Sequence, residues 1–407
     1  MTDFAIANAN VMDVHAGSLL GERTVLVEDG IIVDIVDGPA SGDVVVDLSG
    51  LTLMPGLCDG HVHVTAATPD FALLGSWSPS YVTARAGAIL NDMLMRGFTT
   101  VRDAGGADHG LAQAVDEGYV VGPRILFAGK ALSQTGGHGD MRTPGQQTFE
   151  GCFCCAGLGR ICDGVSEVRR AARDEIRKGA TQIKIMGSGG VSSPTDRIDS
   201  TQFSVEEISA IVEEADAANI YAMSHAYTAR AIERLLECGV RTIEHGNLLE
   251  SSTCEAFLRH DAYLVPTLST YHAIAREGVE AGMPEAMQRS VYEVLDAGTA
   301  ALEMAYRAGV NIVYGTDLLG DMHTYQLEEL SIRSGIVSNA DIIRSATCTA
   351  AQAFQREGEF GEVAVGASAD LIALDGNPLD RLDVLADPSA HLKFVMKAGQ
   401  IFKSELD

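Results

Sequence analysis

The sequence predicts an α/β fold, a (β/α)8 TIM barrel with a small β-sandwich domain formed from both chain ends. Three observations support this prediction. Apolar β-rich runs alternate with helical stretches eight times over about 300 residues, which is typical of such a barrel. The two chain ends contain short alternating strands instead. Polar side chains recur at the ends of the predicted barrel strands.

The chain ends have the same β-rich character. Residues 1–55 contain runs such as "RTVLVEDGIIVDIVDG", with Gly, Asp and Asn at the turns, and residues 365–407 contain "HLKFVMKAGQIF". Because two β-rich ends flank a different middle, we expect residues 1–55 and 365–407 to form one composite β-sandwich domain. Residues 56–364 are then expected to form the barrel.

The middle of the chain supplies the eight predicted barrel strands. Helical stretches of suitable length separate most of them, including one expected over 284–309, and Ser204 with Glu207 predicts a capping box at a helix start. A doubly wound open sheet is the alternative, but it usually has fewer strands and places polar residues less regularly. The predicted strands lie in PGLCDGHVHV, GFTTVRDAGG, PRILFAGKAL, ATQIKIMGSGG, IYAMSHAY, VRTIEHG, AYLVPTL and VNIVYGTD.

Composition and charge exclude several classes of partner. The 407 residues are 46% hydrophobic and 21% charged, as in ordinary globular proteins, and the formal net charge is −27. This charge argues against nucleic-acid and anionic-membrane partners, which need basic patches. No signal-peptide pattern opens the chain and no apolar run approaches a membrane span, so we expect a cytoplasmic protein.

Four of the eight cysteines lie in one segment, "CFCCAGLGRIC", as Cys152, Cys154, Cys155 and Cys162. The segment contains no histidine and lacks paired CxxC spacing. We therefore expect a loop with reduced or incidentally oxidisable thiols rather than a metal-binding site.

The polar residues at the strand ends predict a metal centre. A single histidine is more often a core or surface residue than a ligand, but four histidines, a lysine and an aspartate at the ends of five predicted strands are hard to explain by chance. Four imidazoles and a carboxylate suit zinc or a similar divalent ion. The residues are His61 and His63 after the first strand, Lys184 in the fourth, His225 in the fifth, His245 in the sixth and Asp317 in the eighth.

Lys184 lies between Ile183 and Ile185, where an ammonium group would be costly to bury. A neutral lysine amine can take up CO2 to form a carbamate, here N6-carboxylysine, whose two oxygens can bridge two metal ions. Water between two metals is acidified to hydroxide near neutral pH. Asp317 can then take the proton and deliver it to a leaving amine.

Several motifs carry a resemblance to a known family. The motifs PGLCDGHVHV, IKIMGSGGVSSPTD, SHAYT, IEHG, VPTL and GTDLLGDMH together resemble the amidohydrolase superfamily. More narrowly, they are similar to its binuclear-zinc branch of Xaa-Pro and related dipeptidases, which includes carboxypeptidase-like and ochratoxin-hydrolysing relatives. The similarity runs almost end to end, as far as VMKAGQIF.

The resemblance implies a role for each residue of the site. His61, His63 and Asp317 would bind one metal, His225 and His245 the other, and carboxylated Lys184 would bridge them. Three further residues would contact the substrate: Tyr227 as a hydrogen-bond donor to the scissile carbonyl oxygen, His138 at the position that holds a substrate α-carboxylate, and His323 as a pocket residue of open role.

The leading functional hypothesis is hydrolysis of an amide bond next to a free carboxylate, as in a dipeptide, an N-acyl amino acid or ochratoxin A. Hydrolysis of a cyclic amide or imidazolone on the same fold is the first alternative. A catalytically silent scaffold paralogue is the second, but such paralogues typically lose ligands that are all present here. Assembly into a homo-oligomer is also expected.

Overall fold

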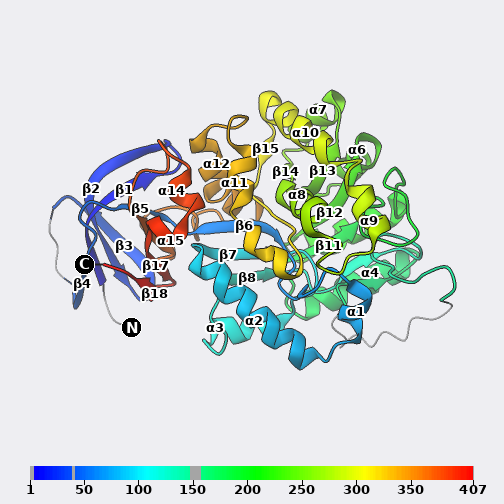
Figure 1. Ribbon diagram of the computed structural model, residues 1–407, viewed down its shortest axis with the longest axis horizontal. Helices are drawn as coiled ribbons and strands as arrows, with labels where there is room; N and C mark the ends of the chain where they lie inside the picture. The colour runs from blue at the N-terminus through cyan, green and yellow to red at the C-terminus, as the bar shows by residue number, and fades with distance from the viewer. Residues whose placement is uncertain (1–3, 39–41, 147–156, 407) are drawn as a thin grey trace.

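Strands from both ends of the chain pair in one sheet. The computed structural model describes residues 4–38, 42–146 and 157–406 (Figure 1). Eight strands follow the order β18-β17-β16-β5-β1-β2-β3, with β4 beside β1. They are β1 (Phe4–Asp13), β2 (Ser18–Glu28), β3 (Ile31–Val36), β4 (Val44–Asp47), β5 (Thr52–Pro55), β16 (Leu371–Leu374), β17 (Leu392–Lys397) and β18 (Gln400–Ser404).

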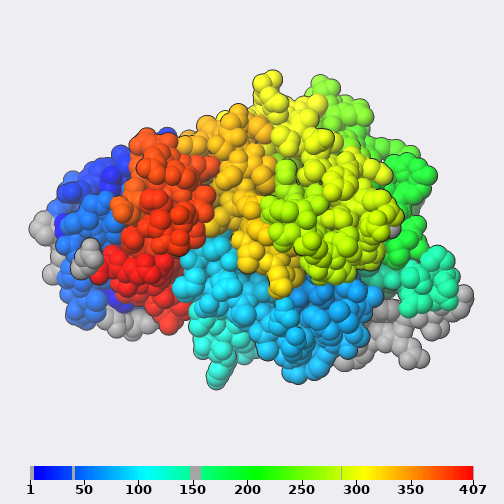
Figure 2. Space-filling model, viewed as in Figure 1, coloured from blue at the N-terminus to red at the C-terminus, as the bar shows by residue number. Residues whose placement is uncertain are grey.

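The antiparallel pairing of β5 with β16 joins the two ends of the chain, and Leu371 lies opposite Pro55 there. This sheet has an apolar cluster of its own, which includes Ile6, Val25 and Phe394. Figure 2 shows the same union from outside, with C-terminal residues in red packed against N-terminal residues in blue. The two-layered sandwich and the domain bounds stay predictions.

Within the described residues, the strands in the middle of the chain are all parallel. They form a three-stranded sheet, β6-β7-β8, and a seven-stranded sheet, β10-β9-β11-β12-β13-β14-β15. Their bounds are β6 (Leu57–Val62), β7 (Phe98–Asp103), β8 (Arg124–Phe127), β9 (Ala131–Ser133), β10 (Gly159–Ile161), β11 (Gln182–Met186), β12 (Tyr221–Thr228), β13 (Thr242–Leu248), β14 (Tyr263–Val265) and β15 (Asn311–Ile312).

Backbone hydrogen bonds join the two parallel sheets on both sides. The Gly60 N–H in β6 donates to the Tyr314 carbonyl just after β15, at 2.7 Å, and the Thr181 N–H just before β11 donates to the Phe127 carbonyl of β8, at 2.9 Å. The two sheets are therefore joined at β6 with the segment after β15 and at β8 with the segment before β11.

Helices separate most of these strands along the chain. The first eight are α1 (Phe71–Ser76), α2 (Pro79–Met95), α3 (His109–Asp116), α4 (Val165–Arg177), α5 (Val205–Ala217), α6 (Ala229–Glu237), α7 (Ser251–Arg259) and α8 (Leu268–Glu277). The others are α9 (Glu285–Val291), α10 (Leu295–Ala308), η1 (Gly320–Tyr325), α11 (Glu328–Arg333), α12 (Asn339–Ser345), α13 (Cys348–Ala353), α14 (Asp383–Ala386) and α15 (Pro388–His391).

The predicted helix starts and faces have clear physical causes. Ser204 and Glu207 form the expected capping box of α5, with each side chain bonded to the other residue's backbone N–H. In α4 the buried residues recur at Val168, Ala171, Ala172 and Glu175. This three- and four-residue spacing places one face of the helix against the strands.

Two predicted elements are divided in the structure. The run PRILFAGKAL forms β8 and β9, because the chain turns at Gly129 with a φ of +71°. The helix predicted over 284–309 is two helices, α9 and α10. Between them the Val294 N–H donates to the Val291 carbonyl across a turn of residues 291–294. Both valines are buried in one apolar cluster.

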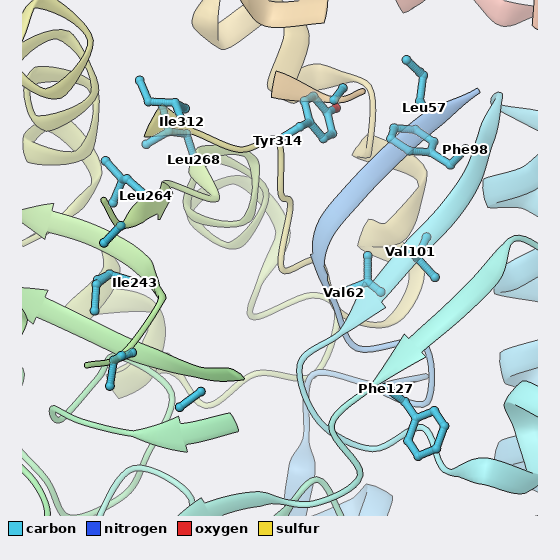
Figure 3. Close-up of a cluster of buried hydrophobic side chains, with 14 of the residues drawn as sticks. Leu57, Val62, Phe98, Val101, Phe127, Ile243, Leu264, Leu268, Ile312 and Tyr314 are labelled. Atoms are coloured by element: carbon cyan, nitrogen blue, oxygen red, sulfur yellow. The ribbon is translucent and has the colours of Figure 1, made fainter. Parts of the chain in front are cut away.

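The largest apolar cluster lies around the parallel strands and their helices. Figure 3 shows part of it, with Leu57 of β6 beside Phe98 of β7 and Ile243 of β13 beside Leu264 of β14. Within the described residues, no helix is both long enough and apolar enough to cross a membrane.

Candidate active site

The six predicted metal ligands all lie where parallel strands end. The carboxyl ends of parallel strands meet at one edge, which is where active sites of such folds form. The four histidines and the lysine are at most 7% exposed, and the Asp317 side chain is 21% exposed. They are His61 in β6, His63 just after it, Lys184 in β11, His225 in β12, His245 in β13 and Asp317 after β15.

Asp317 faces the histidines of the first strand. Its Oδ1 lies 3.5 Å from His61 Nε2 and 3.3 Å from His63 Nε2. The Asp317 N–H also donates to the His61 carbonyl at 2.8 Å. Gly315 permits this approach, because a Cβ there would lie 2.3 Å from a Val265 methyl carbon.

The remaining histidines complete a cluster of rings. The ring centroids of His61 and His245 are 5.1 Å apart, and those of His225 and His245 are 4.6 Å apart. Potential ligand atoms of His61, His245 and Asp317 all lie within 4.8 Å of one another. This spacing is suitable for a shared cation.

Each imidazole has one nitrogen bonded to an acceptor outside the cluster. His61 Nδ1 lies 2.7 Å from Glu244 Oε2, and His63 Nδ1 lies 2.7 Å from the Gly105 carbonyl. His245 Nδ1 lies 2.7 Å from Thr267 Oγ1, whereas His225 uses Nε2, 3.1 Å from the Gly189 carbonyl. An imidazole that donates through one nitrogen keeps a lone pair on the other, so these donors fit divalent metal ions.

Burial keeps three of the histidines neutral. Burial lowers the pKa of His245 to about 3. Burial and the charge on Lys184 lower the pKa of His61 well below its ordinary value. Burial and the charge on His138 do the same for the pKa of His225. Burial also lowers the pKa of His63, but the hydrogen bond and charge of Asp317 outweigh it and raise that pKa overall.

The two other predicted ligands have shifted pKa values as well. Burial lowers the pKa of Lys184 to about 8 against the opposing charges of Glu244 and Asp317. Burial would raise the pKa of Asp317, but His61 and His63 hold it below the ordinary range. Near neutral pH, a neutral amine is therefore accessible beside an ionised carboxylate.

Three residues of the site have left-handed backbone conformations. The φ angles are +78° at His245, +48° at Thr267 and +54° at Asp317. Such conformations are uncommon for non-glycine residues and tend to occur where a side chain must point in a required direction. At His245 the turn lets adjacent residues of one strand, Glu244 and His245, both contact His61.

Tyr227 lies beside the histidine cluster. Its ring stacks on His245 with centroids 5.4 Å apart, and burial raises the pKa of its hydroxyl, so the group stays protonated. Tyr271, which the sequence did not indicate, donates a hydrogen bond to the Tyr227 oxygen at 3.0 Å.

The two other predicted substrate residues lie in different surroundings. His138 stacks on His225 with centroids 4.2 Å apart, and its Nδ1 lies 3.0 Å from Ser193 Oγ. Gly190 makes room for it, because a Cβ there would meet the ring at 2.2 Å. His323 is buried in η1, its pKa is lowered to about 3 by burial and by Arg96, and its role stays a prediction.

A buried charged network behind His61 was also missed from the sequence. Arg102 donates to both carboxylate oxygens of Glu244, at 3.0 and 3.2 Å, and to the Gly60 carbonyl at 2.7 Å. Both side chains are fully buried. Glu244 precedes His245 in the sequence, so its position beside a ligand was the one available signal.

A cavity of about 840 Å³ is lined in part by Gly190 and Ser193, which contact His138. Loops after β6, β9, β11 and β13 and the segment around α9 line it, with apolar side chains such as Phe71, Ile198 and Met287.

Cys152, Cys154 and Cys155 lie outside the described residues, so the expectation for their segment stays a prediction. Cys162 is a buried free thiol whose pKa is raised to about 12 by burial.

The chain is similar to several known proteins in sequence and in structure. Ochratoxinase of Aspergillus niger is 32% identical over 364 residues, which cover 86% of this chain and 75% of that protein. The crystal structure of a prolidase complexed with N-methylphosphonate-L-proline has a TM-score of 0.96 and 48% identity, covering 99% of this chain and 100% of that one.

A Xaa-Pro dipeptidase with bound methionine is a more distant structural neighbour. Its TM-score is 0.89 at 27% identity, covering 99% of this chain and 100% of that one. The profile described as Amidohydrolase family matches residues 52–402, which is most of the chain. The chain is therefore a member of the amidohydrolase family, with an α/β fold.

Proposed function

We propose that this protein is a metal-dependent amidohydrolase that cleaves an amide bond next to a free carboxylate. The observation that carries the proposal is the cluster of four imidazoles, each held by an outer acceptor, with Asp317 facing His61 and His63. Neutral imidazoles with second partners and an ionised carboxylate are the usual donors of a catalytic zinc site.

The residues divide into two sets of ligands. His61, His63 and Asp317 would hold one divalent ion, His225 and His245 would hold a second, and Lys184 would lie between the two sets. When bound, the ions would acidify a water molecule and polarise the scissile carbonyl group. Zinc is the ion that this donor set suits best.

Lys184 would bridge the ions as N6-carboxylysine. Its neutral amine would add to CO2, forming one N–C bond and releasing one proton. The pKa of about 8 supports this role, because the neutral amine is present in useful amounts near neutral pH.

Asp317, Tyr227 and His138 would act on the substrate. Asp317 would accept a proton from the attacking water and donate it to the leaving nitrogen. The protonated Tyr227 hydroxyl would donate to the carbonyl oxygen as negative charge develops there. His138, in the loop after β9, would hold the substrate carboxylate.

The fold prediction is part of the same proposal. Backbone hydrogen bonds on both flanks of the parallel sheets support a closed (β/α)8 barrel over residues 56–364. The pairing of β5 with β16 supports one terminal domain of residues 1–55 and 365–407. The homo-oligomer stays a prediction.

The comparisons and the cavity support the substrate class. The similar proteins include a prolidase complexed with N-methylphosphonate-L-proline and an ochratoxinase, and a cavity of about 840 Å³ is within the range for small-molecule sites. We therefore propose dipeptides, including Xaa-Pro, N-acyl amino acids and ochratoxin A as candidate substrates.

The test compares matched substrates with and without the carboxylate. Purified protein is assayed on L-Xaa-L-Pro dipeptides, N-acyl amino acids and ochratoxin A, and on the C-terminal amides of the dipeptides. We expect hydrolysis of the free acids only, loss of activity after chelation, and recovery with zinc. Full activity in a metal-free preparation contradicts metal dependence, and equal rates on the amides contradict carboxylate recognition.

A further inference from the structure

Tyr271 belongs to a group of buried polar side chains beside Tyr227 and His245. It lies in α8, whereas Tyr227 lies in β12, and their hydroxyl oxygens are 3.0 Å apart. Thr267, the residue before α8, has its hydroxyl 2.7 Å from His245 Nδ1. All four side chains are at most 4% exposed, so water does not compete for these bonds.

The hydrogen bond between the two tyrosines has a direction. Tyr271 donates its single hydrogen to the Tyr227 oxygen, which accepts it.

This direction leaves one hydrogen unassigned, on Tyr227. The Tyr227 oxygen accepts a hydrogen bond from Tyr271, so the Tyr227 hydroxyl hydrogen is not used in that bond. The ring stacks on His245 and lies edge-on to His225, with centroids 5.4 and 4.9 Å apart, which places the tyrosine beside both histidines.

We infer that Tyr271 is a positioning residue that directs the Tyr227 hydroxyl hydrogen toward the substrate carbonyl oxygen. The inference rests on the proposed function, in which Tyr227 is the donor. A phenol hydrogen rotates about the C–O bond, and a donor fixed on its oxygen removes the orientation in which Tyr227 would donate back to Tyr271. The Tyr227 hydrogen then needs less reorganisation when charge develops on the substrate.

The residue before α8 also has an uncommon backbone conformation. Thr267 has a φ of +48°, which is rare for a β-branched residue and persists only where surrounding structure requires it. This conformation places its hydroxyl 2.7 Å from a ring nitrogen of His245, at the start of the helix that carries Tyr271.

A purely structural role for Tyr271 makes a different prediction. Its ring packs in an apolar cluster with Ile274, Met283 and Val291, and phenylalanine would fill the same space. Tyr271→Phe therefore removes the hydroxyl and keeps the packing. A structural role predicts a change in stability without a selective change in turnover.

The test is a double-mutant cycle on a dipeptide that the wild type hydrolyses, using Tyr227→Phe, Tyr271→Phe and the double variant. We expect kcat to fall about a hundredfold in Tyr227→Phe. In Tyr271→Phe we expect kcat to fall about tenfold with KM unchanged, because only the orientation of the donor is lost. The double variant should match Tyr227→Phe alone.

A second measurement is independent of turnover. Calorimetry with N-methylphosphonate-L-proline, whose tetrahedral phosphonate resembles the hydrolytic transition state, should show weaker binding in Tyr271→Phe by the same factor as kcat. Tyr306→Phe is the matched control, because it removes a tyrosine hydroxyl bonded 2.7 Å from Asp341, away from the site. It should leave kcat and phosphonate binding unchanged.

The outcomes separate this inference from the proposed function. An unchanged kcat in Tyr271→Phe, or an equal loss in the wild-type and Tyr227→Phe backgrounds, overturns the inference alone. An unchanged kcat in Tyr227→Phe removes that residue's proposed role and the inference with it. A wild type that hydrolyses none of the candidate substrates and does not bind the phosphonate overturns both.

Discussion

His61 and His245 lie side by side, with ring centroids 5.1 Å apart, but different groups hold their outer nitrogens. Behind His61 is Glu244, a fully buried carboxylate paired with Arg102. Behind His245 is the neutral hydroxyl of Thr267. Two adjacent imidazoles with similar burial thus depend on a charged network in one case and on a hydroxyl in the other.

The difference has a physical consequence. A buried ion pair breaks at high cost, because removing one charge leaves the other without compensation. Losing a neutral hydrogen bond costs less free energy. A hydroxyl that donates in one bond can only accept in the next, so such bonds fix the orientation of neighbouring groups. We therefore expect the His61 side to determine stability and metal retention, and the His245 side to determine orientation.

The largest expected effect comes from Asp317→Asn, on the His61 side. The variant keeps the shape of the side chain but removes the anionic ligand and the proposed proton acceptor. We expect activity to fall about a thousandfold or more, and metal content to fall toward one ion per chain as the His225 and His245 set remains. Elemental analysis and steady-state assays check this. Two retained ions with normal turnover would contradict the proposed role.

Glu244→Gln should destabilise the fold strongly, because it leaves Arg102 buried without its carboxylate. We expect the free energy of unfolding to fall by about 3–5 kcal/mol, measured by denaturant titration. Glu214→Gln, which alters a partly exposed ion pair with Arg173, is the control and should change little. Equal small changes in both variants would remove the contrast between the two sides.

Thr267→Val should have a smaller effect, on the His245 side. It keeps the β-branched shape and leaves the His245 Nδ1–H without its acceptor, so we expect a loss of about 1–3 kcal/mol in unfolding free energy. Thr267→Ser retains the hydroxyl and serves as the control. A loss as large as that of Glu244→Gln would show that charge is not what separates the two sides.

Lys184, the proposed bridge between the two sides, gives the smallest predicted effect, a pH dependence. With a pKa of about 8, its neutral fraction rises about fivefold from pH 7 to pH 8. When zinc and CO2 are added to metal-free protein at constant dissolved CO2, the rate of activation should therefore be about fivefold higher at pH 8 than at pH 7. A rate independent of pH in this window would argue against carbamate formation on Lys184.

The same shift has a defined sign for stability. An unfolded lysine keeps a pKa near 10.5, so between about pH 8 and 10.5 the unfolded chain binds more protons than the folded one. The Lys184 contribution to the free energy of unfolding of the metal-free protein therefore rises with pH across this window. It is constant below about pH 8, where both states are protonated.

Part of the site could be predicted because strand periodicity places side chains reliably. His61 and His63 are two residues apart, and Lys184 interrupts an apolar strand, so each had a local signal. The structure brings these residues together with His225, His245 and Asp317 at one edge of the parallel strands. The Ser204 capping box was predictable for the same reason, because its two partners are three residues apart.

Other features had no local signal. Strand periodicity predicts that Glu244 and His245 point to opposite sides of the strand. Both nevertheless lie beside His61, because His245 has a left-handed backbone conformation. The break between α9 and α10 was missed because their combined helical pattern gives no sign of the turn that buries Val291 and Val294.

The sequence by itself determined the alternation of strands and helices, the paired β-rich ends and the residue types of the candidate metal centre. Only the tertiary structure decided which acceptor holds each imidazole and which hydroxyl faces Tyr227. The reason is separation along the chain: His61 meets Glu244 across 183 residues, and Tyr271 meets Tyr227 across 44. Periodicity acts over a few residues, whereas these contacts exist only after the strands and α8 have packed together.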